Sequence, residues 1–365
     1  MRKVWLFSPA TDLFTLFIPV WTTWAICFLL PEQTLSREIP LWIWVVVVMC
    51  IDVSHVWSTL FRTYLDKEEF HHHKRLLTVA PFLAFILLLT ITMTSISMFY
   101  TALAYFAVYH FLKQQYGFMR ILQGRYGESG KKILSDTFVI YTAMIFPVIF
   151  WHINTGQNFF WFVEGDFISI PVLSDNMLFY MNRIGKITYF IVLGAWLAEE
   201  IFLALKRKNP LHYGKILWIL TTAANWYLGI VFFNSDLAFT MTNVVAHGVP
   251  YIVLISLYVK RKKEIKQSVK FTFSKTMMIF FTIMAGIMVL AFVEEYFWDM
   301  LLYRDNPSFF QFLLTYPVEV LENPYARALA ISFLALPQVT HYILDGFIWK
   351  ANSSNPFLKE IVFKR

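Results

Sequence analysis

The chain has 365 residues, of which 58% are apolar and only 15% are charged, with a formal net charge of +7. A typical soluble domain carries about 25% charged residues, so this composition excludes a cytosolic enzyme and a disordered regulator. The two cysteines, Cys27 and Cys50, lie within apolar stretches and offer neither a disulfide framework nor a thiolate metal site. The composition predicts an integral membrane protein whose surroundings are the lipid bilayer.

Ten stretches reach the roughly 20 apolar residues that a membrane-spanning helix requires. We therefore predict an all-α, polytopic membrane helical bundle of about ten transmembrane helices, forming a single integral membrane domain over residues 1–365. Two boundaries are weakly marked, because the third and fourth spans share one apolar stretch and only Asn234-Ser235-Asp236 separates the seventh from the eighth. The spans are expected near residues 12–31, 40–62, 77–96, 97–119, 134–153, 186–205, 214–233, 237–259, 272–293 and 327–349.

The placement of lysine and arginine tests this count, since cytoplasmic loops retain an excess of both residues. Starting from a cytoplasmic N-terminus and alternating through ten spans puts 26 basic residues inside and five outside. An error in the number of spans would put every later loop on the wrong side and destroy this asymmetry. The pattern predicts ten spans with both termini cytoplasmic, in a cell inner membrane. It also explains the positive net charge as a topology signal, so we expect no nucleic-acid partner.

Four histidines fall inside predicted spans, where ionisable side chains are costly and usually mark a functional site. They are His55, His110, His247 and His341, in the second, fourth, eighth and tenth spans. All four spans run inward, and the histidines lie about 16, 14, 11 and 15 residues from the outer ends. At a rise of about 1.5 Å per residue they share a slab about 8 Å thick. We predict that they bind one metal ion, as in helix-bundle metal sites; the alternative is that each bonds a neighbouring helix.

Two aspartates accompany these histidines. Asp52 precedes His55 by three residues and Asp345 follows His341 by four, so each shares a helix face with its histidine. A ligating imidazole usually donates its second N–H to a carboxylate or carbonyl, and a divalent cation would compensate the buried negative charge. The spacing leaves open whether the two aspartates orient the histidines or bind the metal themselves.

The identity of the metal follows from ligand chemistry. Imidazole suits iron, copper, zinc and nickel, and no thiolates cluster nearby. Four histidines leave open positions on an octahedral iron, which oxygen activation requires, so Fe(2+) is the predicted ion, with other divalent transition metals as alternatives. Gln114, about one turn after His110, is a further candidate cofactor-binding residue. The candidate catalytic residues, which would contact substrate, are Tyr109, Tyr116 and Tyr342.

One segment resembles a known family. Residues 337–350 (PQVTHYILDGFIWK) are similar to the C-terminal segment of the Brp/Blh family of membrane β-carotene 15,15′-dioxygenases, and Tyr109-His110-Phe111 followed by Gln115-Tyr116-Gly117-Phe118 is similar to a second histidine-bearing segment of that family. Asp52 with His55 resembles a third segment, in reversed order. The likeness spans about 40 residues. It implies a non-haem iron that splits a conjugated double bond with dioxygen. The four histidines are the matching ligands, although His247 matches by its role and not by its neighbouring sequence.

Three functions compete at this point. The leading hypothesis is an iron oxygenase that uses dioxygen on a lipid-soluble substrate such as a carotenoid, isoprenoid or acyl chain. The second is an ion- or proton-coupled transporter that uses the buried histidines and aspartates. The third is a haem-binding electron carrier, which would usually place its histidines at two depths. An uncharacterised bacterial multi-spanning family with a similar histidine site is an equally good resemblance.

Overall fold

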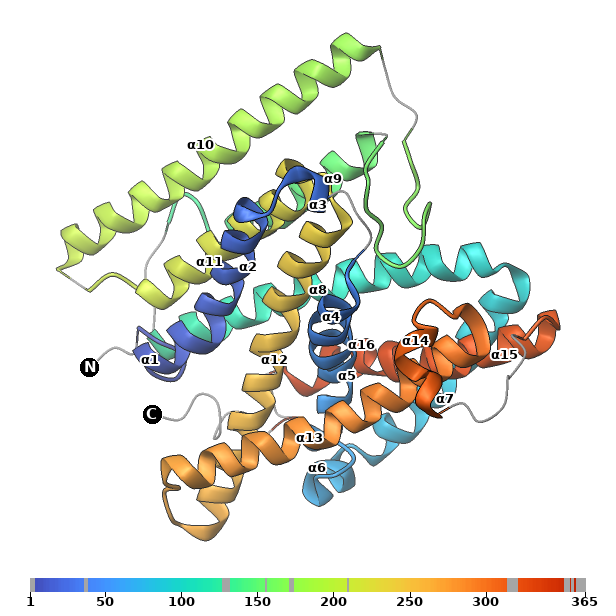
Figure 1. Ribbon diagram of the computed structural model, residues 1–365. Coiled ribbons are helices and arrows are strands. Elements are labelled where there is room, and N and C mark those ends of the chain that lie inside the picture. Colours follow the sequence, from blue (N-terminus) through green and yellow to red (C-terminus); the bar gives the residue numbers. More distant parts are fainter. Residues whose placement is uncertain are drawn as a thin grey trace. The chain divides into compact units, whose positions relative to one another are not determined.

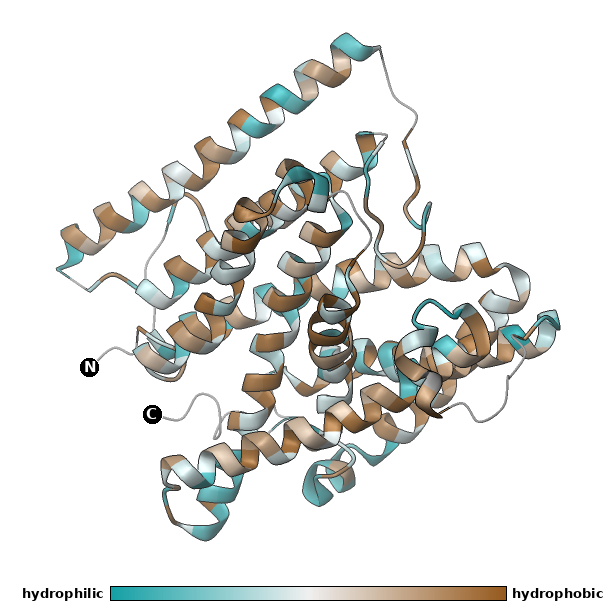
Figure 2. Cartoon of the chain, viewed as in Figure 1, coloured by the Kyte–Doolittle hydropathy of each residue, from teal (hydrophilic) through white to brown (hydrophobic). Residues whose placement is uncertain are grey.

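The computed structural model describes residues 4–35, 39–126, 132–154, 156–170, 174–208, 210–313, 321–350, 355 and 358. Within these ranges every regular element is a helix (Figure 1). Nine helical segments of the described part of the chain are long and apolar enough to cross a membrane, and Figure 2 shows apolar residues along much of their length. The all-helical class and the presence of several membrane-spanning candidates are therefore confirmed. The count of ten spans and the side on which each terminus lies stay predictions.

The nine segments correspond to nine of the ten predicted spans. They are Pro9–Leu29, Leu41–Arg62, Lys74–Thr94, Asp136–Ile153, Asp175–Arg207, Tyr213–Phe232, Asp236–Gln267, Phe273–Tyr303 and Pro324–Ile348. The stretch predicted as the fourth span, 97–119, is helical within α8 (Ile96–Tyr126) but is not among the nine. Its tyrosine, glutamine and histidine side chains make α8 more polar than its neighbours.

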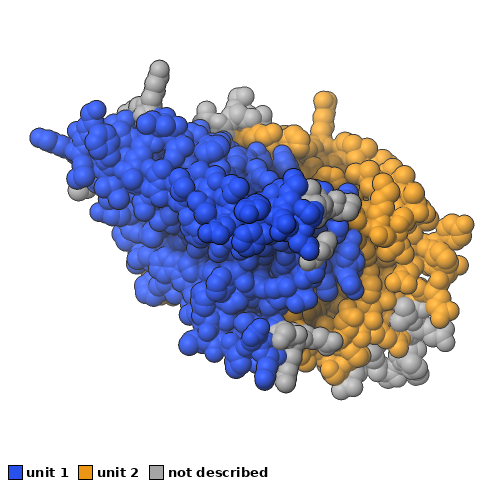
Figure 3. Space-filling view, turned by 90° about the horizontal axis from the view of Figure 1, so that it is seen from above, with its two compact units in different colours: residues 1–38, 108–249, 363–365 blue, residues 39–107, 250–362 orange. Residues whose placement is uncertain are grey.

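The chain divides into two compact units, which Figure 3 shows in different colours. The first comprises residues 1–38, 108–249 and 363–365, and the second 39–107 and 250–362. Two long helices, α8 and α12 (Asp236–Gln267), contribute residues to both units. The other helices of the first unit are α1 (Pro9–Asp12), η1 (Leu13–Phe17), α2 (Ile18–Leu29), α3 (Glu32–Leu35), α9 (Asp136–Ile153), α10 (Asp175–Arg207), α11 (Tyr213–Trp226) and η4 (Tyr227–Phe232).

A buried ionic network joins three helices of the first unit. The ammonium of Lys215, at the start of α11, lies 3.0 Å from carboxylate oxygens of both Asp136 in α9 and Glu200 in α10. Lys132 pairs with the same two carboxylates, and the indole of Trp196 donates to Asp136 at 2.8 Å. Buried charges are tolerated only when paired and hydrogen-bonded. Because each charge here has a partner of opposite sign, the network fixes α9, α10 and α11 relative to one another.

The second unit carries the remaining helices. They are α4 (Leu41–Ile43), η2 (Trp44–Val53), α5 (Ser54–Ser58), η3 (Thr59–Arg62), α6 (Lys67–His72), α7 (Lys74–Thr94), α13 (Phe273–Trp298), η5 (Asp299–Tyr303), α14 (Pro307–Phe310), η6 (Gln311–Leu313), α15 (Pro324–Leu334) and α16 (Leu336–Ile348). Helices α15 and α16 pack against α7, and α13 packs against α5. The tenth predicted span is broken at Ala335, because Pro337 has no N–H and its ring crowds the preceding turn.

Candidate metal centre

The second unit holds one pair of buried histidines, His55 on α5 and His341 on α16. Each side chain is about 1% exposed, and the ring centroids are 5.0 Å apart with the planes at 80°. His55 is the second residue of α5, which directly follows the π-helical segment η2. Such π-helical turns are uncommon and occur frequently at functional sites. The break at Ala335 begins α16, so His341 lies in the second turn of a short helix packed on α7.

A chain of hydroxyl groups fixes the orientation of His341. The Thr59 hydroxyl oxygen lies 2.6 Å from Nδ1 of His341 and 3.0 Å from the hydroxyl of Tyr251, and Tyr251 donates to Asp345 at 2.6 Å. Because the single Tyr251 proton goes to the carboxylate, Thr59 must donate to Tyr251. Thr59 then accepts from Nδ1–H of His341. With the proton on Nδ1, Nε2 is the nitrogen of His341 that carries the lone pair and could ligate a metal ion.

The first unit holds the other pair, His110 on α8 and His247 on α12, with ring centroids 5.0 Å apart. Both side chains are buried. Phe111 stacks on the His247 ring at a centroid distance of 3.6 Å with the planes within 9°. The ring of Trp161 contacts that of Phe111 edge-on, with the centroids 5.0 Å apart. An apolar aromatic wall therefore restricts rotation of the His247 imidazole.

Two glutamines of α8 attach that helix to α12 beside His247. Gln114 donates to the carbonyl of His247 at 2.8 Å, and Gln115 donates to the carbonyl of Ala246 at 3.2 Å. The Gln115 side-chain oxygen accepts from Thr222. The buried Oε1 of Gln114 accepts no hydrogen bond from the described residues. A buried acceptor without a donor costs free energy, so this oxygen favours a polar ligand beside the histidines.

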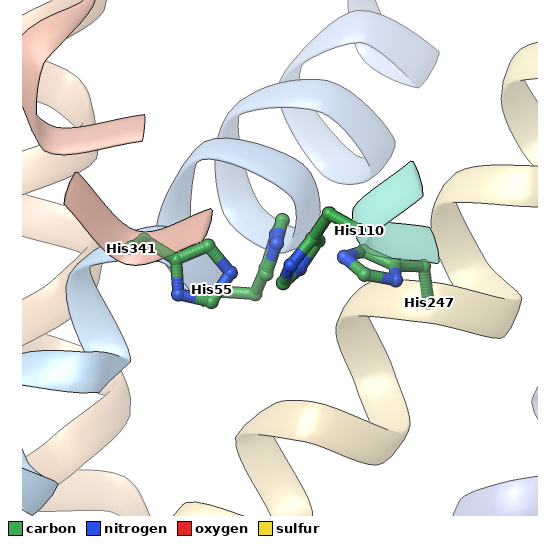
Figure 4. A group of neighbouring side chains, drawn as sticks. All are labelled: His55, His110, His247 and His341. Atoms are coloured by element: carbon green, nitrogen blue, oxygen red, sulfur yellow. The ribbon is translucent and has the colours of Figure 1, made fainter. Parts of the chain in front are cut away.

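The four histidines that the sequence grouped by depth lie together. One nitrogen from each lies within 4.8 Å of the other three, and all four residues are buried (Figure 4). Among the described residues this is the one group of three or more His, Cys, Asp or Glu side chains with such convergence. Ligands on opposite sides of a metal at about 2.1 Å are about 4.2 Å apart. Adjacent ligands on an octahedral ion are closer, about 3.0 Å apart, so the imidazoles must draw together when they bind one ion.

The two aspartates lie on the predicted helix faces, at different distances from their histidines. Asp52 is 3.5 Å from Nδ1 of His55 and Asp345 is 3.8 Å from Nδ1 of His341. At 3.8 Å there is no direct hydrogen bond, so Asp345 acts on His341 through Tyr251 and Thr59. Asp52 remains 31% exposed, whereas Asp345 is largely buried.

Sequence reasoning missed the two hydroxyl residues of this chain. Thr59 follows His55 by four residues and Tyr251 follows His247 by four, so each shares a helix face with a candidate ligand. A search of the positions one turn away for hydroxyl groups as well as carboxylates would have found both.

The three candidate tyrosines have different surroundings. Tyr342 is next to the centre, its ring 5.7 Å from that of His341, and its hydroxyl accepts from Gln338 at 2.8 Å. Tyr116 stacks on Tyr141. Tyr109 is 63% exposed and points away from the face of α8 that buries His110. Contact of any of the three with a substrate stays a prediction.

The geometry defines a class: an all-helical protein with helices suited to a membrane and a buried cluster of four imidazoles. Comparison with family models, with curated proteins and with solved structures finds no match to this chain.

Proposed function

We propose that this chain is a multi-pass inner-membrane metalloprotein whose four histidines hold one Fe(2+), and that it oxygenates a lipid-soluble substrate. The observation that carries the proposal is the convergence of four buried imidazole nitrogens within 4.8 Å. Buried imidazoles without thiolates suit first-row transition metals. Four nitrogen ligands leave positions open on an octahedral ion, and iron supplies at those positions the ability to bind and activate dioxygen.

The surrounding residues have separate roles in this proposal. Thr59 keeps the proton on Nδ1 of His341, and Phe111 keeps the His247 ring in one plane. The unfilled acceptor of Gln114 is available to a polar group bound beside the histidines. Phe111 and Trp161 give the centre an apolar wall suited to a hydrocarbon substrate. The resemblance of residues 337–350 to the carotene dioxygenases supports cleavage of a conjugated double bond, in which one O₂ and one C=C bond become two carbonyl groups.

The test is metal analysis and an absorption spectrum of the full chain purified in detergent. We expect about one iron per chain, no Soret band, and loss of the iron in His341→Ala. The matched control is His72→Ala, because His72 is exposed and lies on α6. Zinc in place of iron would overturn the oxygenase proposal and leave a metal centre. A Soret band would show that the protein binds haem instead of a non-haem iron. Metal-free protein from iron-replete and zinc-replete cells would overturn the whole proposal.

One observation favours the second candidate, a proton- or ion-coupled transporter. Glu294 of α13 accepts a hydrogen bond at 2.7 Å from the indole of Trp57 on α5, inside two candidate membrane spans. Ionisable groups at such depth often form ion pathways. Proton-coupled uptake into proteoliposomes that is lost in Glu294→Gln and unaffected by chelation of metal would support the transporter over the oxygenase.

A further inference from the structure

The first unit contains a cavity whose lining residues do not include the histidine pair it carries. Its volume is about 730 Å³, within the range of about 300–1,000 Å³ typical of small-molecule sites. The end of α9, the loop over residues 156–170 and the start of α12 form its walls. The charge pattern of the sequence predicts this loop on the non-cytoplasmic side, where a ligand would arrive from outside the cell.

The walls combine negative charge with aromatic rings. Three carboxylates line the cavity, and no lysine or arginine is among its lining residues. Cations bind over aromatic faces when a ring lies within about 6 Å, and the attraction grows when water is excluded. The carboxylates are Glu164, Asp166 and Asp236, and the aromatic residues are Trp151, Phe159, Phe160 and Phe167. Together they favour a cation with an apolar body.

The loop that forms the cavity is organised by its own hydrogen bonds. Asp166 accepts from the backbone N–H groups of Trp161, Phe162 and Val163. The amide of Asn234 bridges the loop, since its oxygen accepts from the N–H of Asn158 and its nitrogen donates to a glycine carbonyl. Trp151 packs on the ring of Phe167 at 4.3 Å. Asp166, Trp151 and Phe167 are thus held in place by contacts within the protein.

The arrangement of the carboxylates favours an organic cation over a metal ion as the ligand of this cavity. Within the described part of the chain, the carboxylates of this cavity form no convergent group of three ligand atoms. A calcium ion requires six to eight oxygen ligands at 2.3–2.6 Å, whereas an alkylated ammonium ion needs only diffuse negative charge and aromatic faces. We propose that this cavity binds a small organic ammonium cation, in a site formed by residues other than the four histidines.

The proposal is tested by calorimetric titration of the full-length protein in lipid nanodiscs. The probes are choline and its neutral isostere 3,3-dimethylbutan-1-ol, which share one shape and differ in charge. We expect saturable one-to-one binding of choline and binding of the alcohol that is weaker by about tenfold or more. Equal affinity for both probes, or no heat from choline at millimolar concentration, overturns the proposal. Calcium binding without choline binding also overturns it.

Two variants place the binding in this cavity. Glu164→Gln and Phe160→Leu change exposed side chains, so neither should affect folding, which thermal unfolding checks. Each is expected to weaken choline binding at least threefold, and the double variant Glu164→Gln/Asp236→Asn to abolish it. The matched control is Asp305→Asn, which removes one exposed carboxylate outside this cavity. Variants that bind choline as the unmodified chain does would refute the assignment.

Discussion

The hydroxyl oxygen of Thr59 lies 2.6 Å from Nδ1 of His341. This contact links the imidazole to the Asp345 carboxylate through Tyr251 and makes Nε2 the nitrogen of His341 that could ligate a metal. The carboxylate one turn away on the same helix does not bond the ring directly, since 3.8 Å separates the two groups. A residue from a different helix therefore contacts the ring directly, in the orienting role that was one of the two roles expected for Asp345.

Replacing Thr59 with valine should weaken metal binding by about 10–100-fold, the usual cost of losing a group that orients a ligating histidine. Valine keeps the branched shape and removes the hydroxyl, so the Nδ1 proton of His341 loses its acceptor. Competition with a chromogenic chelator measures the change. Thr78→Val is the control, because the Thr78 hydroxyl bonds carbonyls of its own helix, α7. Equal affinity in the Thr59 variant and the unmodified chain would contradict the hydrogen-bonded chain.

Replacing Phe111 with leucine should lower metal affinity by about two- to tenfold. The aromatic stack on His247 is worth about 0.5–1.5 kcal/mol beyond its buried area, and leucine retains most of the volume without the flat face. The same chelator competition measures it. Phe106→Leu serves as the control, since Phe106 lies on the same helix and is exposed. A parallel loss in both variants would show that helix stability, and not the stack, is responsible.

Replacing Lys215 with methionine should destabilise the fold by about 3–5 kcal/mol, because the buried carboxylates lose one of their two positively charged partners. Asp136 and Glu200 would share the single cation of Lys132. Adding Glu200→Gln should recover part of the loss, which a double-mutant cycle of thermal or denaturant unfolding measures. Lys206→Met is the matched control, since Lys206 is exposed at the end of α10. Additive effects of the two substitutions would argue against a shared network.

The stability of the second unit should depend on pH through His73. Burial lowers the pKa of His73 below its usual value, an effect opposed by Asn355 and Glu69 and reinforced by His72 and Arg62. The folded state therefore prefers the neutral ring, and the unfolded state binds more protons once the pH falls below about 6.5. This stability is present above that pH and is lost progressively as the pH falls through the lowered pKa.

His73→Gln should flatten the pH dependence of thermal unfolding between about pH 7 and pH 5, because glutamine does not titrate. The control is His72→Gln, which changes the exposed neighbouring histidine. An unchanged slope in His73→Gln, or an equal change in both variants, would assign the pH dependence to other groups.

Local properties of the sequence determined where the helices form and at what depth the four histidines lie. Long apolar stretches become helices because a chain in lipid must satisfy its backbone hydrogen bonds internally. The junctions at Ser95 and at 233–235 lie where the sequence marked them weakly, since α7 ends at Thr94 and α12 begins at Asp236. The grouping of His55, His110, His247 and His341 followed from depth alone, because a rise per residue is nearly constant along any helix.

Only the tertiary structure decided which side chains meet. Each step along a helix turns a side chain by about 100°, and the rotation of a whole helix depends on what it packs against. The sequence could therefore give the depth of Tyr109 and not its outward direction. The same limit hid the bond from Thr59 to His341 and the stack of Phe111 on His247, which join different helices. Depth is a property of one segment, whereas direction is a property of the packed molecule.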